Sequence, residues 1–212
     1  MNKTILIDDR VNRQKKHLAE RLDELNQFPF LKNISGGEGF EEIHRHFIES
    51  DFSYLDMFNP ILIHRSAFSV NTRNELIDYL KSKEKKVVFF SGGISGCEIS
   101  KIGKAELMMI NVTQFYSENM FVFLKNNANN LLELAFGNNW QLSIQIDTYE
   151  KLILYKKSFK DCPVIKIEND LGLNKWIIEK YFKTKLNSSI LHLSNLEEIL
   201  EELKTDIKQL LQ

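Results

Sequence analysis

Polar side chains that could do chemistry stand directly after three short apolar runs of the sequence. Thr4–Ile7 precedes Asp8 and Asp9, Pro60–Ile63 precedes His64, and Val87–Phe90 precedes Ser91. An apolar run that ends abruptly in polar residues is typical of a buried strand in a parallel sheet. Ligands of such sheets bind just beyond the carboxyl ends of the strands. The sequence therefore predicts one sheet edge that collects two carboxylates, an imidazole and a hydroxyl.

Two kinds of ligand suit these residue types. The Asp8 and Asp9 carboxylates offer the hard oxygen atoms that Mg²⁺ prefers, which makes them a weak metal site. Ser91, Gly92 and Gly93 open a loop to Gly96 whose backbone N–H groups could cradle a phosphate. The loop has neither the Walker lysine nor the dinucleotide spacing. Structural interpretations stay open: a helix cap for the acidic pair, a hydrogen-bonded histidine, and a tight turn.

The elements that must position these residues alternate along the first 125 residues. The expected strands are Lys3–Ile7, Phe30–Ile34, Met57–Ile63, Val87–Phe90 and Ala105–Val112. The expected helices are Arg10–Asn26, Phe40–Ile48, Asn71–Ser82 and Ser117–Lys125. Alternation of this kind predicts an α/β fold, a flavodoxin-like, doubly wound parallel sheet with helices on both faces. We expect this domain to span residues 1–125.

A polar, Asn-rich stretch at residues 125–130 is the expected linker to a smaller, mostly helical or mixed segment, 131–212. Within that segment the patterns predict helices at Leu131–Phe136 and Lys175–Phe182 and a strand at Pro163–Ile167, and they leave 140–146 and 149–157 open between strand and helix.

The last helix begins with a predicted capping box, Ser194 at the N-cap and Glu197 three residues on. Seven large apolar residues then form one stripe: Leu196, Ile199, Leu200, Leu203, Ile207, Leu210 and Leu211. Such a stripe must be covered. Packing within the same domain remains open, and so does docking on a second copy, as a homodimer, or on a partner.

Composition limits the partners. The 212 residues carry a formal net charge of −1 and 43% hydrophobic residues, so nothing favours nucleic acid or an anionic membrane. The two cysteines, Cys97 and Cys162, match no metal spacing and are expected to be free thiols. Asp8 and Asp9 interrupt the first apolar run, so we expect no signal segment and a cytoplasmic protein.

The first 125 residues resemble the receiver domains of bacterial two-component response regulators. In that family an acidic pair after the first strand holds Mg²⁺, which matches Asp8 and Asp9, and a Ser or Thr ends the fourth strand, which matches Ser91. The phosphorylatable aspartate of the third strand is replaced by His64. The lysine of the fifth strand is replaced by Asn111. The resemblance therefore implies a degenerate receiver, a pseudo-receiver that is not phosphorylated in the usual way.

The expected function is a non-enzymatic regulatory or signalling module that binds a protein partner. The alternative is an enzyme or binder of a phosphoryl group or small ligand that uses Asp8, Asp9, His64 and Ser91. Phosphohydrolases of the haloacid dehalogenase type share some of this pattern. Their first motif needs Asp-x-Asp, whereas Arg10 and Val11 stand two positions after the two aspartates.

Overall fold

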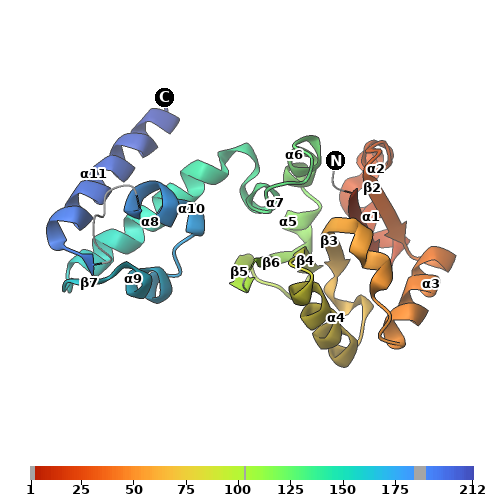
Figure 1. The fold of residues 1–212 in the computed structure, drawn as a ribbon. Coiled ribbons are helices and arrows are strands. Elements are labelled where there is room, and N and C mark those ends of the chain that lie inside the picture. The colour runs from red at the N-terminus through yellow and green to blue at the C-terminus, as the bar shows by residue number, and fades with distance from the viewer. Residues whose placement is uncertain (1–2, 103, 184–189) are drawn as a thin grey trace. The chain divides into compact units, whose positions relative to one another are not determined.

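The computed structural model describes residues 3–102, 104–183 and 190–212. The chain divides into two compact units, Met1–Asn138 and Asn139–Gln212. Each unit has its own set of helices and strands (Figure 1). In the part of the chain that the structure describes, no helix combines the length and apolar character that a membrane span requires.

A six-stranded sheet forms the centre of the first unit. Its strands are β1 (Lys3–Asp8), β2 (Leu31–Ser35), β3 (Phe58–His64), β4 (Lys86–Ser91), β5 (Cys97–Ile102) and β6 (Ala105–Asn111). They lie in the order β2-β1-β3-β4-β6-β5. Every neighbouring pair is parallel except β5 and β6, which form an antiparallel hairpin at one edge. The α/β prediction is confirmed, and this strand order is compatible with a flavodoxin-like fold.

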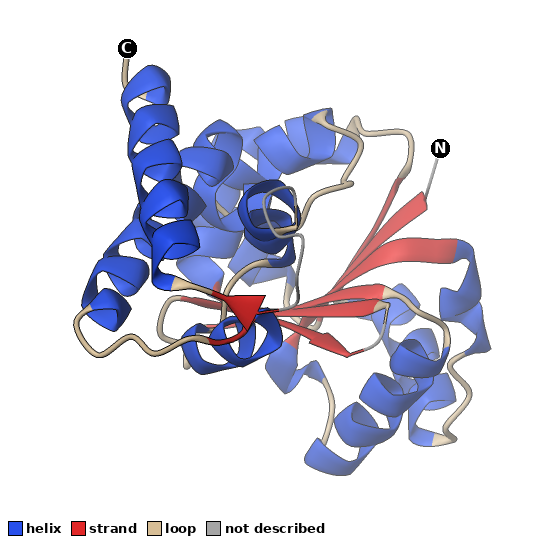
Figure 2. Cartoon of the chain, turned by 60° about the vertical axis from the view of Figure 1, so that its left-hand side comes forward, coloured by secondary structure: helices blue, strands red, loops and turns tan. Residues whose placement is uncertain are grey.

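Helices cover both faces of this sheet (Figure 2). They are α1 (Val11–Leu18), α2 (Leu22–Asn26), α3 (Gly37–Ile48), α4 (Val70–Ser82), α5 (Val112–Phe115), α6 (Glu118–Lys125) and α7 (Leu132–Phe136). One core cluster joins β-strand residues such as Leu6 and Phe90 to α1, α2, α5, α6 and α7. The other joins Ile7 and Ile63 to α3 and α4. Since both faces are covered, the central strands are apolar along their whole length, as the sequence indicated.

Three details of the first unit differ from the sequence-based expectations. The loop after Ser91 contains β5, an extra strand that lengthens the sheet at its edge. The helix expected over residues 10–26 is interrupted after Leu18, where Ala19 takes a positive φ of 46° and a short 3-10 turn begins. The expected linker at residues 125–130 lies inside the first unit, because Ala128 is 1% exposed and packs in the core beside α6 and α7.

The second unit is mostly helical. Its long helices are α8 (Trp140–Lys156) and α11 (Leu193–Leu210), which pack together, and Lys156 pairs with Glu197 across them at 2.8 Å. The rest of the unit consists of α9 (Val164–Leu171), α10 (Lys175–Ile177), a π-helical turn (Ile178–Phe182) and a two-stranded antiparallel ladder of β7 (Cys162–Pro163) and β8 (Ile190–Leu191).

The second unit settles the segments that the sequence left ambiguous. Residues 140–146 and 149–157 belong to α8, apart from Lys157, which comes just after the helix. The strand predicted at 163–167 is wrong beyond Pro163, because α9 begins at Val164 and buries Ile167 while leaving Ile165 exposed, as a helical period requires. The helix predicted at 175–182 is confirmed as α10 and the π-helical turn.

The last helix begins one residue before the predicted cap. His192 is the N-cap, and its backbone N–H donates to Asn195 Oδ1 at 3.3 Å, so the predicted Ser194–Glu197 box is wrong. Packing within the unit is confirmed for the first half of the stripe, where Leu196, Ile199, Leu200 and Leu203 are buried, whereas Leu210 and Leu211 are exposed.

The two halves of α11 give a matched pair of substitutions. Leu203 is fully buried and Leu210 is 49% exposed, so we expect Leu203→Ala to lower the free energy of unfolding by about 2–5 kcal/mol and Leu210→Ala by about 0.5 kcal/mol or less. Trp140 and Trp176, the 2 tryptophans of the chain, both lie in the second unit. Urea unfolding followed by tryptophan fluorescence therefore measures this unit alone, and equal losses in the two variants would contradict the assignment of the stripe.

Candidate functional site

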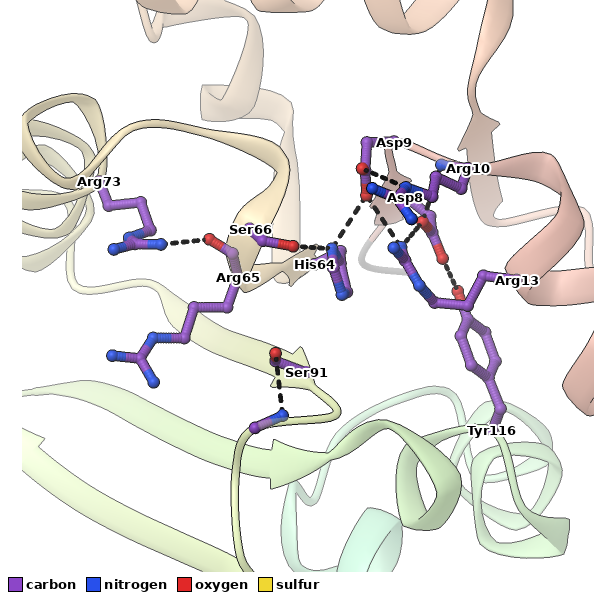
Figure 3. Close-up of polar contacts among 11 residues, drawn as sticks. Asp8, Asp9, Arg10, Arg13, His64, Arg65, Ser66, Arg73, Ser91 and Tyr116 are labelled. Atoms are coloured by element: carbon purple, nitrogen blue, oxygen red, sulfur yellow. Dashed lines mark hydrogen bonds and ion pairs between the residues drawn. The ribbon is translucent and has the colours of Figure 1, made fainter.

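The strand ends meet at one edge of the sheet, as the sequence predicted. In the register, Ile7 lies opposite Ile63, and His64 lies opposite Phe90. Asp8 and His64 therefore each stand one residue beyond the matched pair Ile7 and Ile63. Asp9 directly follows Asp8, and Ser91 is the last residue of β4. The close-up in Figure 3 shows Asp8, Asp9 and His64 drawn together, with Ser91 farther along the edge.

Asp8 is completely buried and fully hydrogen-bonded. Its Oδ1 accepts from the backbone N–H of Arg10 at 3.0 Å and pairs with the Arg13 guanidinium. Its Oδ2 accepts from the Tyr116 hydroxyl at 2.7 Å. Burial raises the pKa of Asp8, and these donors and the Arg13 charge only partly offset it. Burial and the adjacent Asp8 charge raise the pKa of Tyr116 in turn, which keeps the phenol a proton donor.

Asp9 is the second carboxylate on the same guanidinium. Arg13 Nη1 lies 2.8 Å from Asp9 Oδ1, and His64 Nδ1 lies 2.9 Å from that same oxygen. Burial raises the pKa of Asp9, but the hydrogen bond and charge of Arg13, with a contribution from His64, outweigh burial and hold the pKa below its ordinary value. Asp9 is therefore an ionised acceptor shared by a cation and an imidazole.

His64 is neutral at pH 7. Burial, followed by the charge of Arg13, lowers its pKa from 6.5 to about 4, although Asp9 acts in the opposite direction. An ionised carboxylate oxygen at 2.9 Å requires a donor on Nδ1, so His64 is the Nδ1–H tautomer and Nε2 keeps its lone pair. The Ser66 hydroxyl lies 3.1 Å from the same Nδ1. The imidazole ring also packs edge-on against the Phe90 ring, with the two ring centroids 5.3 Å apart. This apolar contact favours the neutral form of His64.

Ser91, Gly92 and Gly93 form a turn apart from the acidic pair. Ser91 Oγ accepts from the Gly93 N–H at 3.4 Å. Asn111, at the end of β6, ties down the rest of this loop, because its Nδ2 donates to the Ile94 carbonyl at 2.8 Å and its N–H to the Gly96 carbonyl at 3.0 Å. The edge therefore brings Asp8, Asp9 and His64 into contact and leaves the Ser91 loop as a separate turn.

The metal interpretation can be tested against this donor set. Asp8, Asp9 and His64 each offer a ligand atom, and these atoms lie within 4.8 Å of one another. The Arg13 guanidinium, however, already contacts both carboxylates, and Tyr116 and His64 donate to them as well. Mg²⁺ requires oxygen ligands with free lone pairs in an octahedron. The arrangement does not fit Mg²⁺ while Arg13 remains in place.

Two residues of this network were not singled out from the sequence. Arg13 stands four positions after Asp9, so an i,i+4 pairing on α1 was a signal that could have found it. Tyr116 lies 108 positions from Asp8, and no local pattern connects the two.

Comparison with known proteins adds no family to this description. No family model, no curated protein and no solved structure matches the chain.

The Arg13 network makes a stability prediction. We expect Arg13→Met to lower the free energy of unfolding by about 3–5 kcal/mol, because it leaves a buried carboxylate pair without its counter-charge. Arg10→Met is the matched control, since Arg10 is 74% exposed and lies 3.4 Å from Asp9, and a surface pair contributes about 0–1 kcal/mol. Urea unfolding followed by far-UV circular dichroism measures both. Equal effects of the two substitutions would show that Arg13 is not the central cation.

The lowered pKa of His64 predicts a pH dependence. The unfolded chain binds a proton at His64 near pH 6.5, whereas the folded protein binds it only near pH 4, so stability falls as the pH drops through this window. The full loss from this residue is about 3 kcal/mol. We expect His64→Gln to remove this component, so that the stability difference between wild type and variant changes with pH between 6.5 and 4. Parallel curves across that window would contradict the buried neutral imidazole.

Proposed function

We propose that the chain is a receiver-like regulatory module with a flavodoxin-like topology that does not take up a phosphoryl group in the usual way and acts by binding a protein partner. The sheet order supports the topology. Without the hairpin strand β5, the parallel strands lie in the order β2-β1-β3-β4-β6. Since β6 is then the fifth strand along the chain, this is the order 2-1-3-4-5 of flavodoxin-like sheets. The cytoplasm is the compartment we propose, because Cys97 and Cys162 are both free thiols.

One observation carries the proposal. The Arg13 guanidinium lies between Asp8 and Asp9, where a receiver would hold its metal ion. A guanidinium supplies positive charge and five donors, but it cannot coordinate an incoming phosphoryl oxygen as a metal does. His64 and Asn111 stand where a phosphorylatable carboxylate and a lysine are expected, and Asn111 is engaged in holding the loop after β4. These features together favour a structural role for the carboxyl edge of the sheet over a role in phosphoryl transfer.

A second candidate is a binder or enzyme for a small ligand or phosphoryl group that uses Asp8, Asp9, His64 and Ser91. The observation that favours it is the Asp9–His64 pair, because a carboxylate that fixes Nδ1–H leaves Nε2 as a base or nucleophile. His64 is only 4% exposed, which limits access to that nitrogen.

Incubation with acetyl phosphate and Mg²⁺ separates the two candidates. We expect the intact mass of the protein to stay unchanged, because His64 stands where the phosphorylatable aspartate is expected and the Arg13 guanidinium already contacts both Asp8 and Asp9. The mass is measured at neutral pH, since a phosphoramidate on histidine is lost in acid. A phosphorylatable receiver domain treated in parallel is the positive control. A stable gain of one phosphoryl group would reject the first candidate, and its loss in His64→Gln would assign it to the second.

A further inference from the structure

A cavity of about 650 Å³ lies beside the edge strand β2, away from the Asp8–His64 network. Its walls come from β2, from one side of α3 and from Asp51, Ser53 and Tyr54 after that helix. In Figure 1, β2 and α3 lie next to each other in the first unit, at the end of the sheet opposite β5. The volume falls in the range of about 300–1,000 Å³ that is usual for binding sites.

The backbone of β2 presents to this cavity hydrogen-bonding groups that have no partner among the described residues. The carbonyl of Phe30 accepts from Thr4, and the N–H of Gly36 donates to Asp8, so these two residues turn their backbones toward β1. The parallel ladder alternates with a period of two, which turns Asn33 and Ser35 the other way. In the sheet, β2 has β1 as its one neighbour. The N–H and C=O groups of Asn33 and Ser35 therefore point outward along the cavity.

The cavity has an apolar floor and a polar margin. Ile34 from β2 and Ile43 and Phe47 from α3 line it and are buried, at 7%, 5% and 0% exposure. His46 and Asp51 form a half-exposed pair at 3.1 Å at the margin. An extended chain beside β2 would place every second side chain toward α3 and this floor. Such a chain needs an apolar side chain at alternate positions.

Gly36 and Gly39 line the end of the cavity near the turn from β2 into α3. Gly36 has a φ of +58°, a conformation that glycine accepts without strain. A Cβ placed on Gly39 would approach the Ile34 side chain no closer than 3.9 Å, so this helix position faces the cavity with free space. Ser35 Oγ at the same end is buried and has no hydrogen-bond partner among the described residues.

We propose that this cavity binds an extended peptide segment of a partner protein, which adds a strand to β2 and places apolar side chains at alternate positions on the floor of Ile34, Ile43 and Phe47. Main-chain hydrogen bonds to Asn33 and Ser35 supply the pairing, and the floor supplies the preference for apolar side chains. The site goes beyond the proposed function, since it shares no residue with the Asp8–His64 network and does not depend on whether the chain is phosphorylated.

A single extended strand suits the cavity better than the sheet edge of a second copy. The cavity is lined by α3 and by Asp51, Ser53 and Tyr54 as well as by β2. A second β2 would arrive with its own α3 beside it, and the two helices would compete for the same space. A peptide strand has no flanking helix and can lie along the whole edge.

The probe is a library of random decapeptides displayed on phage and selected against the full-length protein. Selected sequences are then synthesised with a fluorescent label, and their binding is followed by fluorescence anisotropy. We expect apolar residues at alternate positions in the selected peptides. A selection that yields no peptide binding better than to an unrelated α/β protein would overturn the proposal.

Two substitutions at one position isolate the main-chain contact. Asn33→Pro removes the outward N–H of β2 without breaking a bond to β1. Asn33→Ala keeps that N–H but loses the same side-chain hydrogen bonds to Gln14 and Asn26. We expect Asn33→Pro to weaken peptide binding at least tenfold relative to Asn33→Ala. Equal affinities in the two variants would overturn the strand-addition mode.

A second pair keeps the test valid if Asn33→Pro fails to fold. Gly39→Phe fills the cavity, and Glu41→Phe adds the same ring to an exposed position of α3 outside it. We expect the first to weaken binding at least tenfold and the second to leave it unchanged. Light scattering tests the alternative that a second copy of the chain occupies the edge of β2. A dimer that dissociates in Asn33→Pro and persists in Asn33→Ala would assign this edge to the second copy and overturn the peptide proposal.

Discussion

The guanidinium of Arg13 between two carboxylates is the interaction on which the carboxyl edge of the sheet depends. Asp8 and Asp9 are adjacent in sequence, and Asp8 has no exposure to solvent, so their charges would repel strongly without an internal cation. Guanidinium geometry allows one side chain to serve both carboxylates. With Arg13 in place, Asp8 can hold Tyr116 after α5 and Asp9 can hold His64 at the end of β3. One cation thereby links β1 to elements on both sides of it.

Burial explains which parts of this fold could be read from the sequence. The strands β1, β3 and β4 are covered on both faces, and therefore they appear as continuous apolar runs that end in polar residues. The strand β5 has β6 as its one neighbour and mixes polar with apolar residues, so its residues resemble a loop. At Val164 the β-branched run suggests a strand, but the apolar positions Val164, Ile167 and Leu171 repeat with the period of a helix.

The candidate site, like the fold, could be predicted from the sequence only in part. Asp8, Asp9 and His64 could be placed at one edge because parallel strands end on the same side of a sheet. The contact with Tyr116 that holds Asp8 could not be predicted, because Tyr116 comes from a distant part of the chain and is positioned by tertiary packing alone. The rings of Phe90 and Phe115 stack with their centroids 4.0 Å apart, and both rings contact Tyr116. The same rule about strand ends places Ser91 beside the acidic pair, but the hydrogen bonds within its own turn keep the Ser91 loop separate.

The two edges of the sheet, at β5 and at β2, differ in structure, and this difference bears on where a partner can bind. At one edge the chain adds β5 to β6 through a hairpin, which satisfies the outer backbone groups of β6 and makes the short strand β5 the edge. At the other edge β2 faces a cavity, with outward backbone groups that the described residues do not cover. The carboxyl edge of the sheet has the opposite character: its two carboxylates share the single positive charge of Arg13, a covalent part of α1 that cannot exchange with solvent ions as a bound metal does. A metal ion can therefore bind at the carboxyl edge only if Arg13 moves away, whereas a strand can pair with β2 without disturbing any bond inside the sheet. If the protein is a regulatory module, the edge strand is the surface at which a partner can bind at the lower conformational cost.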